Sequence, residues 1–307
     1  MKEILLRAPA TVANFGPGFD IFSLALEKPC NLFRVRLCDS PSLTIIITGE
    51  DENIPTAPEN NTAGLAAIHF FKKINSSLGA EIEIIKRMKS GSGLGSSAAS
   101  AVASVYGLNR LCRSALKDKE IIEIASLGEV ASGGAPHADN VAGCLLGGFV
   151  MIKKYSPLDF AKIEVPDIPL VIGVMRKPQQ TTRHLIPENL RLSEMKEQMS
   201  SCASLVHALL AGDLQAIGRA VNKDYISEPV RSRFIPGYQD IKDKILSAGA
   251  YGCNVSGGGS SVFAICRKNK TEEVAGLLKA HFRQEQIEGE VIITRGSNSG
   301  VAEVDEL

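Results

Sequence analysis

The sequence predicts an α+β protein built from two domains. At 307 residues the chain is longer than most single domains and can bury a large core. Segments with the two-residue period of strands alternate with segments of helical period in both halves. An irregular stretch with two prolines, residues 153–167, separates the halves. We therefore expect one domain over residues 1–160 and a second over residues 161–307.

The composition argues against several classes of partner. Basic and acidic residues balance at 34 each, so nothing predicts binding to nucleic acid or to an anionic membrane. Aromatic residues make up 5% and tryptophan is absent, which disfavours base-stacking surfaces. No apolar run reaches the ~18 residues of a membrane span, and the N-terminus lacks a signal-like apolar core. Seven scattered cysteines without a C-x-x-C pair indicate reduced thiols, so we expect a cytoplasmic protein.

The first half alternates strand-like and helix-like segments behind a loop at residues 8–20 that is rich in glycine and proline. This loop, APATVANFGPGFD, contains the polar residues Thr11, Asn14 and Asp20, and asparagine and aspartate are frequent turn formers. The expected elements are strands at 3–8, 31–37, 43–48 and 81–87, and helices at 62–73, 98–111 and about 118–131.

The second half follows a segment, 132–152, that is small and polar at first and then strand-like. A glycine turn, SGGGSS at 256–261, resembles either an anion-binding turn or a tight hairpin. The expected elements are strands at 169–175, 262–266 and 289–294, helices at about 189–211, 213–223, 238–248 and 271–284, and a loop at 224–236.

Residues 89–111, KSGSGLGSSAASAVASVYGLNRL, contain the strongest local signal for function. Alternating glycines let backbone N–H groups crowd around an anion, and the alanine-rich helix that follows aims its unpaired N–H groups at the same point. Ser96 and Ser97 suit the start of this helix and can reach a phosphate oxygen or a metal ion. The pattern indicates a phosphate-binding loop, and a plain glycine turn before a core helix fits this stretch equally well.

Three further groups of polar residues lie in loop or helix-end positions. His137, Asp139 and Asn140 form the segment HADN, which suits small-molecule recognition, a weak metal pair or a chain turn. Glu129 can complete a Mg²⁺ site with Ser96 or Ser97, or can lie solvated at a helix end.

Arg183 and Arg231 lie in loops, and guanidinium groups suit a carboxylate, although arginines are also common on ordinary surfaces.

Taken in order, four segments resemble the motif set of the GHMP small-molecule kinases: PATVANFGPGFD, GSGLGSSAAS, HADN and SGGGSSVFA. The first and third are similar to those of the homoserine kinase branch of that superfamily. The resemblance spans residues 8 to about 265 and implies a two-domain GHMP kinase-like fold with the active site in the cleft between the domains.

The resemblance also implies a set of ligands and the residues that bind them. The predicted ATP-binding residues are Asn61, Gly91, Ser92, Gly93, Leu94, Gly95, Ser96 and Ser97, and the predicted Mg²⁺ ligands are Ser96 or Ser97 and Glu129. The predicted contacts to L-homoserine are Asn14, Asp20, His137, Asn140, Arg183 and Arg231. Within this set, the arginines meet the substrate carboxylate, Asp20 meets the ammonium group, and the family suggests a homodimer.

The implied reaction is transfer of the ATP γ-phosphoryl group to the homoserine hydroxyl, a step towards threonine. We expect Asn140 and Glu129 to act in catalysis. Several superfamily members use an aspartate base where this chain has Asn140, so we predict no dedicated carboxylate base. Alternatives are another GHMP kinase, acting on mevalonate or shikimate, and a non-catalytic protein that keeps the fold.

Three departures from the family pattern are visible in the sequence. Ser260 replaces a usual proline, Gln179 replaces a usual threonine with Thr181 and Thr182 as stand-ins, and HADN continues as VAG rather than VAP.

Overall fold

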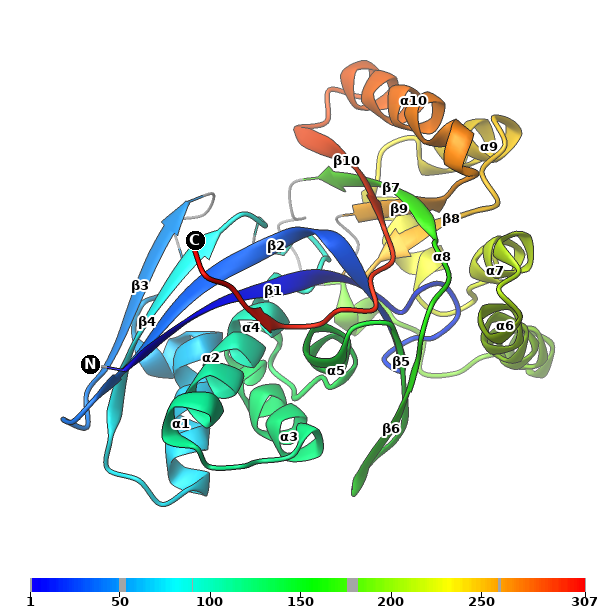
Figure 1. Cartoon of the computed structure of the whole chain (residues 1–307). Coiled ribbons are helices and arrows are strands. Elements are labelled where there is room, and N and C mark those ends of the chain that lie inside the picture. Colours follow the sequence, from blue (N-terminus) through cyan, green and yellow to red (C-terminus); the bar gives the residue numbers. More distant parts are fainter. Residues whose placement is uncertain (1, 50–53, 90, 176–181, 259–260, 307) are drawn as a thin grey trace.

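The computed structural model describes residues 2–49, 54–89, 91–175, 182–258 and 261–306, and within them two β-sheets are covered by helices (Figure 1). The first sheet contains β1 (Glu3–Ala13), β2 (Phe22–Cys38), β3 (Leu43–Gly49), β4 (Gly79–Lys86), β5 (Phe149–Tyr155), β6 (Leu158–Ile163) and β11 (Ala302–Glu303). Its spine has the order β11-β1-β2-β4-β3, and β5 pairs with both β2 and β6. The strands β3 and β4 run parallel, and the other pairs are antiparallel.

Helices from the first half pack against one another and against this sheet (Figure 1). They are η1 (Pro58–Asn60), α1 (Thr62–Lys73), α2 (Ser96–Cys112), α3 (Asp118–Gly128), α4 (Val130–Gly133) and α5 (Asp139–Leu146). The side chains of α2 that face the sheet are mostly alanine and valine, so the helix approaches β1 and β2 closely and its first turn is held rigidly.

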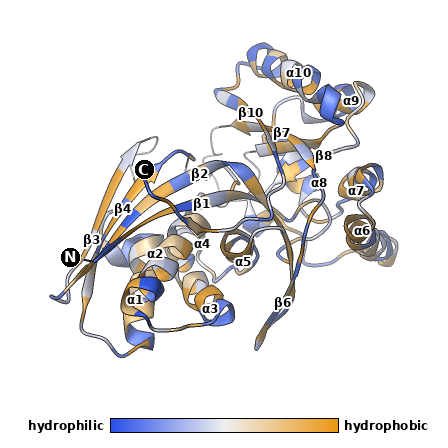
Figure 2. Cartoon of the chain, viewed as in Figure 1, coloured by the Kyte–Doolittle hydropathy of each residue, from blue (hydrophilic) through white to orange (hydrophobic). Residues whose placement is uncertain are grey.

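The second half builds an antiparallel sheet of order β10-β7-β9-β8, from β7 (Pro169–Met175), β8 (Gly252–Ser256), β9 (Ser261–Ile265) and β10 (Gly289–Arg295). Its helices are η2 (Arg183–Leu185), α6 (Leu192–Ala211), α7 (Leu214–Val221), α8 (Glu228–Arg231), η3 (Ser232–Phe234), α9 (Tyr238–Ser247), η4 (Lys268–Lys270) and α10 (Thr271–Gln284). Helices α9 and α10 mix hydrophilic and hydrophobic residues, as Figure 2 shows, and bury their apolar sides against this sheet.

A continuous hydrophobic core joins the two halves. It includes residues of β1, β2, α2 and α5 together with residues of β7, β9, α6 and α7. At the junction the rings of Phe15 and Phe263 stack with centroids 5.4 Å apart, and Phe149 meets Phe15 edge-on. The sides of the cleft are therefore parts of one packed interior.

The α+β class predicted from the sequence is confirmed, with three local corrections. The expected loop at 224–236 contains α8 and η3, so Arg231 ends a short helix, and Arg183 begins η2. Residues 8–13 continue β1 instead of forming a loop, because this stretch is buried on both faces and shows no alternation to read. Residues 153–167, expected to be irregular, contain the end of β5 and all of β6, whose outward residues are exposed.

The division into domains at residue 160 remains a prediction. The second sheet begins with β7 after that point, and the chain end returns to pair β11 with β1 in the first sheet. Across the described ranges, none of the helices combines the length and the apolar character needed to cross a bilayer.

Candidate active site

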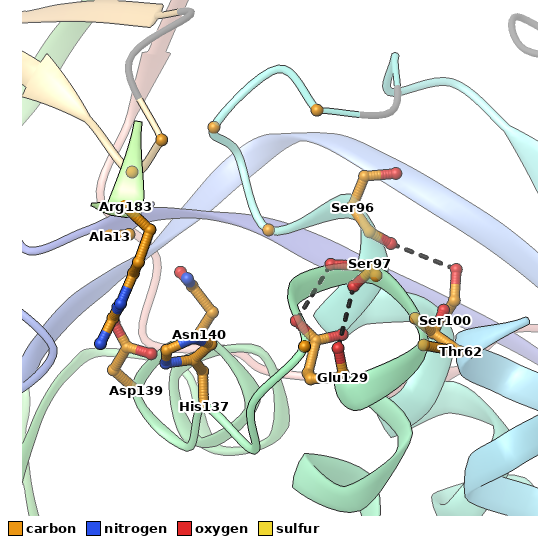
Figure 3. Close-up of a pocket in the computed structure, with 18 of the residues that line it drawn as sticks. Ala13, Thr62, Ser96, Ser97, Ser100, Glu129, His137, Asp139, Asn140 and Arg183 are labelled. Atoms are coloured by element: carbon orange, nitrogen blue, oxygen red, sulfur yellow. Dashed lines mark hydrogen bonds between the residues drawn. The ribbon is translucent and has the colours of Figure 1, made fainter. Parts of the chain in front are cut away.

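One cavity of about 800 Å³ lies between the two halves and is lined by residues of both. Figure 3 shows its two ends: Ser96, Ser97 and Glu129 lie together at one side, and His137, Asp139, Asn140 and Arg183 lie at the other. All site residues predicted from the sequence line this cavity except Ser92 and Leu94. The residues Gln179, Thr181 and Ser260, where the sequence departs from the family pattern, lie outside the described residues.

The glycine loop faces the cavity with its backbone. Gly91, Gly93 and Gly95 have φ values of 71°, 77° and 68°, the left-handed region that glycine adopts without strain. They alternate with Ser92 and Leu94, whose side chains point away from the cavity into buried positions. Because α2 begins directly after this loop, its unpaired N–H groups and positive dipole end point to the space in front of the glycines.

The third glycine motif supports this loop from behind. The Ser256 hydroxyl donates to the Gly93 carbonyl at 2.7 Å, and the Ser261 hydroxyl donates to the Ser92 carbonyl. A Cβ on Gly93 would lie 2.5 Å from the Ser256 carbonyl oxygen, so the two turns pack too closely for a side chain. The described part of SGGGSS thus forms the ends of a β8–β9 hairpin that holds the loop through its Ser92 and Gly93 carbonyls.

The two loop serines have different surroundings, which the sequence did not distinguish. The Ser97 hydroxyl donates to Glu129 Oε2 at 3.0 Å. The Ser96 hydroxyl lies deeper, between Lys86 Nζ at 3.0 Å and Asn31 Nδ2 at 3.2 Å. Among the two, Ser97 is the serine placed beside the predicted metal-binding carboxylate.

Glu129 is a buried carboxylate with an unused acceptor. Burial raises its pKa from 4.5 to about 7, opposed by the hydrogen bond from Ser97 and by the charge of Lys86. Its Oε1 atom is buried without a partner among the described residues. An orphaned carboxylate oxygen beside a hydroxyl fits Mg²⁺, which takes one or two protein oxygens and completes its shell with phosphate and water. The described residues contain no cluster of three or more His, Cys, Asp or Glu side chains arranged for a metal.

The sequence reasoning missed Lys86, which lines the cavity, and Asn31, which lies outside its lining and contacts Ser96. Lys86 is buried at the end of β4, with Nζ 3.0 Å from Ser96 Oγ and 3.2 Å from Ser100 Oγ. The signal was present, because residues 80, 82 and 84 alternate inward and Lys86 continues that phase just before the glycines. Asn31 carries no comparable signal, since it sits in a strand among ordinary neighbours.

Asn61 lines the far end of the cavity, but its side chain is committed to the fold. Its Oδ1 accepts from the N–H groups of Ala63 and Gly64 at the start of α1, and its Nδ2 donates to the Pro55 carbonyl at 2.8 Å. Both hydrogen-bonding ends of the amide are therefore in use. Asn61 shapes this end of the cavity together with Ile54 and Thr62.

At the opposite end, charged groups of both halves meet. Arg183 donates two hydrogen bonds to the Asp20 carboxylate, at 2.8 and 2.5 Å. Arg231 is buried, with Nε 3.3 Å from Thr182 Oγ1 and with Nη1 lacking a partner among the described residues. Burial lowers the pKa of Arg231, and the charge of Asp20 opposes this. A buried guanidinium with an open donor is a site for an anion.

Phe19, which contacts both arginines, was also missed by the sequence reasoning. Its ring centroid lies 5.2 Å from the guanidinium carbon of Arg183 and 5.3 Å from that of Arg231. An aromatic face attracts cations, so one ring aligns both guanidinium groups despite their like charge. Its place in the segment GPGFD, beside Asp20, was the feature of the sequence that could have indicated a role in the site. The sequence does not show that both arginines contact its ring.

Asn14 and Asp20 serve as turn residues and also line the cavity. Their φ values are 66° and 59°, and the Asn14 Oδ1 accepts from the Asp20 N–H at 3.2 Å. The Asn14 Nδ2 is buried without a partner in the described ranges, so it can donate to a ligand. The two interpretations of these residues left open by the sequence are therefore compatible.

The segment HADN places three polar side chains at the start of α5. Asp139 is buried, and burial together with the nearby Asp20 charge raises its pKa to about 6. Burial lowers the pKa of His137, so the imidazole is neutral at pH 7. The Asn140 Oδ1 accepts a hydrogen bond from the Thr11 hydroxyl at 2.6 Å.

Comparisons with known proteins agree with this architecture. The chain matches the family models for the GHMP kinases N terminal domain over residues 61–148 and the GHMP kinases C terminal over residues 205–284. It is 36% identical to a homoserine kinase of Methanococcus vannielii over 281 residues, covering 91% of this chain and 93% of the relative. It is 39% identical to a homoserine kinase of Methanopyrus kandleri over 280 residues, covering 90% and 91%.

A solved structure shows the same fold across the whole chain. The crystal structure of homoserine kinase from Cytophaga hutchinsonii superposes with a TM-score of 0.92 at 36% identity, covering 99% of this chain and 98% of that one. The structure of L. major mevalonate kinase superposes with a TM-score of 0.75 at 17% identity, which is a likeness of fold. The chain therefore belongs to the homoserine kinase family of the GHMP kinases, with their two-domain fold and the glycine loop in the cleft.

Proposed function

We propose that this protein transfers the γ-phosphoryl group of ATP to the hydroxyl of L-homoserine, giving O-phospho-L-homoserine for threonine biosynthesis. The observation that carries the proposal is the make-up of one cavity. It has a glycine loop on a helix N-terminus at one end, and at the other a buried arginine with an open donor beside an aspartate. The first end suits a triphosphate, and the second suits the carboxylate and ammonium groups of an amino acid.

At the nucleotide end, the chain supplies main-chain donors and a cation site. The unpaired N–H groups at the start of α2 and the dipole of that helix would bind the phosphates in front of the glycine loop. Ser97 and Glu129 would hold Mg²⁺, with Ser96 turned to Lys86 instead. When bound, Mg²⁺ neutralises charge that develops on the phosphate oxygens.

At the acceptor end, the ion pair between Asp20 and Arg183 favours a zwitterionic ligand. A ligand that separates the pair must offer a cationic group to Asp20 and an anionic group to Arg183. The homoserine ammonium group would meet Asp20, and its carboxylate would meet Arg183 and the open donor of Arg231. Asn14 Nδ2 and His137 complete the polar lining around the bound amino acid.

The chemistry proposed for this cavity relies on positioning rather than on a base. Asn140 cannot accept a proton, and it would orient the substrate hydroxyl towards the phosphoryl group. In a loose transition state the bond between the γ-phosphorus and the ADP oxygen breaks as the new O–P bond forms, and the hydroxyl proton passes to a phosphate oxygen or to solvent. Neutral His137 would contribute a hydrogen bond and no charge.

Asp139→Asn tests the absence of a carboxylate base. We expect kcat to fall less than about tenfold, because general-base catalysis contributes about 10²- to 10⁴-fold and would be lost entirely if Asp139 supplied it. The measurement is kcat and KM at pH 7.5, where a carboxyl with a pKa of about 6 is ionised. Loss of turnover with KM unchanged would identify Asp139 as the base and refute this part of the mechanism.

A coupled assay of ADP release tests the function itself. We expect ADP formation that depends on L-homoserine, with mevalonate and shikimate giving no rate above background. Turnover of mevalonate or shikimate in preference to homoserine would assign the protein to another GHMP kinase activity. The absence of ATP binding by calorimetry would contradict any kinase function. The predicted homodimer and cytoplasmic location remain predictions from the sequence.

A further inference from the structure

Thr11 lies where the glycine loop, β1 and the start of α5 meet. The residue is fully buried, next to a shift of register between Pro9 and Thr11 in the pairing of β1 with β2. Its backbone N–H donates to the Leu94 carbonyl at 3.0 Å, and its hydroxyl donates to Asn140 Oδ1 at 2.6 Å. One residue thus contacts both the loop predicted to hold phosphates and the amide predicted to orient the acceptor.

The contact occupies the oxygen end of the Asn140 amide. The Thr11 hydroxyl donates to Oδ1, and Nδ2 is the other end of an amide that lines the cavity. Within the described part of the chain, Nδ2 has no protein acceptor. In the observed orientation Nδ2 can donate to an oxygen of the acceptor or of the phosphate.

The packing around Thr11 leaves little freedom. A Cβ on Gly95 would lie 2.2 Å from the Thr11 hydroxyl and 3.5 Å from Asn140 Oδ1. The loop, the hydroxyl and the amide are therefore in direct contact, so displacement of one moves the others.

We propose that Thr11 is a positioning residue for phosphoryl transfer. It fixes the Asn140 amide with Nδ2 towards the reacting oxygens and ties that amide to the glycine loop. The inference rests on the proposed function, because the reacting oxygens are those of the acceptor hydroxyl and the γ-phosphate. Thr11 itself does not contact the cavity, so it acts through Asn140.

The first test compares variants that keep or remove the hydroxyl. Thr11→Val preserves shape and removes the donor, and we expect kcat to fall about 10- to 100-fold with both KM values near wild type, since small misplacements of reacting groups cost this much. Thr11→Ser keeps the donor and restores most of kcat. Ser23→Ala is the matched control, because the buried Ser23 hydroxyl donates to the Asp139 carbonyl at 2.6 Å on the same helix start. It should leave kcat close to wild type.

A double-mutant cycle separates action through Asn140 from a general structural effect. If Thr11 acts only through the amide, Thr11→Val combined with Asn140→Ala has the same kcat as Asn140→Ala alone. Independent effects that multiply would overturn the proposal, as would a Ser23→Ala variant as impaired as Thr11→Val.

An NMR measurement that does not depend on turnover tests the Thr11–Asn140 contact separately from the proposed function. In a sample labelled with ¹⁵N at asparagine, the Asn140 side-chain NH₂ resonance, assigned by its loss in Asn140→Ala, should move in Thr11→Val and stay in place in Thr11→Ser. An unmoved resonance in Thr11→Val would refute the orienting contact. If the wild type released no ADP with homoserine while the resonance behaved as expected, the function would fail and the contact would stand. If Thr11→Val did not fold, Thr11→Ala would replace it in every arm.

Discussion

Glu129→Gln is expected to remove nearly all activity and, in the same protein without ligands, to increase stability at alkaline pH. The buried carboxylate is proposed to hold Mg²⁺, and a neutral amide cannot replace its charge. Loss of one transition-state contact of this kind costs about 100- to 1,000-fold in kcat. Activity measured over a range of Mg²⁺ concentrations checks this, and excess Mg²⁺ should not restore the rate.

The stability gain follows from the raised pKa of Glu129. Because this pKa rises from 4.5 to about 7 on folding, the folded state binds more protons than the unfolded state between these values. The free energy of unfolding therefore falls as pH rises through that window. The loss from this group reaches about 3 kcal/mol by pH 8. Glutamine does not ionise, so the variant avoids the loss at pH 8 and resembles wild type near pH 4.5.

Thermal unfolding in EDTA at pH 5 and pH 8 measures this difference. Glu123→Gln is the matched control, since Glu123 lies on the exposed face of α3, the helix that ends just before Glu129. It should change neither stability nor rate appreciably. If Glu129→Gln were no more stable than wild type at pH 8, the cost of burying the ionised carboxylate would be offset by other interactions in the folded protein.

Arg231→Leu is expected to raise the KM for homoserine roughly 30- to 1,000-fold and to leave the KM for ATP nearly unchanged. Removing one member of a buried charge pair costs about 2–4 kcal/mol, and each 1.4 kcal/mol is tenfold. The unliganded protein should stay folded, because the hydrogen bond that Arg231 loses, from Nε to Thr182 Oγ1, is long at 3.3 Å, and the Thr182 hydroxyl keeps its own bond to the Gly258 carbonyl. The nearby exposed Arg233, changed to leucine, is the control.

A substrate analogue sharpens this test. The carboxamide of homoserine lacks the carboxylate, so wild type should use it about as poorly as Arg231→Leu uses homoserine. The same substitution should then have little effect on the KM for the carboxamide. Equal increases in KM for ATP and homoserine would place Arg231 outside the acceptor site.

The sequence predicted the cavity through residues whose chemistry is local. Alternating glycines before an alanine-rich helix predict an anion site without reference to any other part of the chain. The polar residues of HADN likewise indicate small-molecule binding by themselves. It could not separate Ser96 from Ser97, because successive helical residues point about 100° apart and the sequence does not say which direction faces Glu129. The structure separates them through their partners, Lys86 and Glu129.

Residues that act through distant partners were harder to predict. Thr11 looked like one polar residue in a glycine- and proline-rich loop, because its roles depend on Leu94 and Asn140 in other elements. Phe19 depends on arginines that arrive from the second half of the chain. Lys86 was the exception, since a strand's inward phase already placed it.

The stacked rings of Phe15 and Phe263 limit how this protein can capture its ligands. Both rings are fully buried, and withdrawing either into water would cost about 3 kcal/mol. Hinge opening of the two halves would separate these stacked rings. We therefore expect side chains and short loops at the cleft mouth to control the entry of ligands into the cavity. The Asp20–Arg183 ion pair, which the proposed amino-acid substrate would displace, is a contact of that small scale.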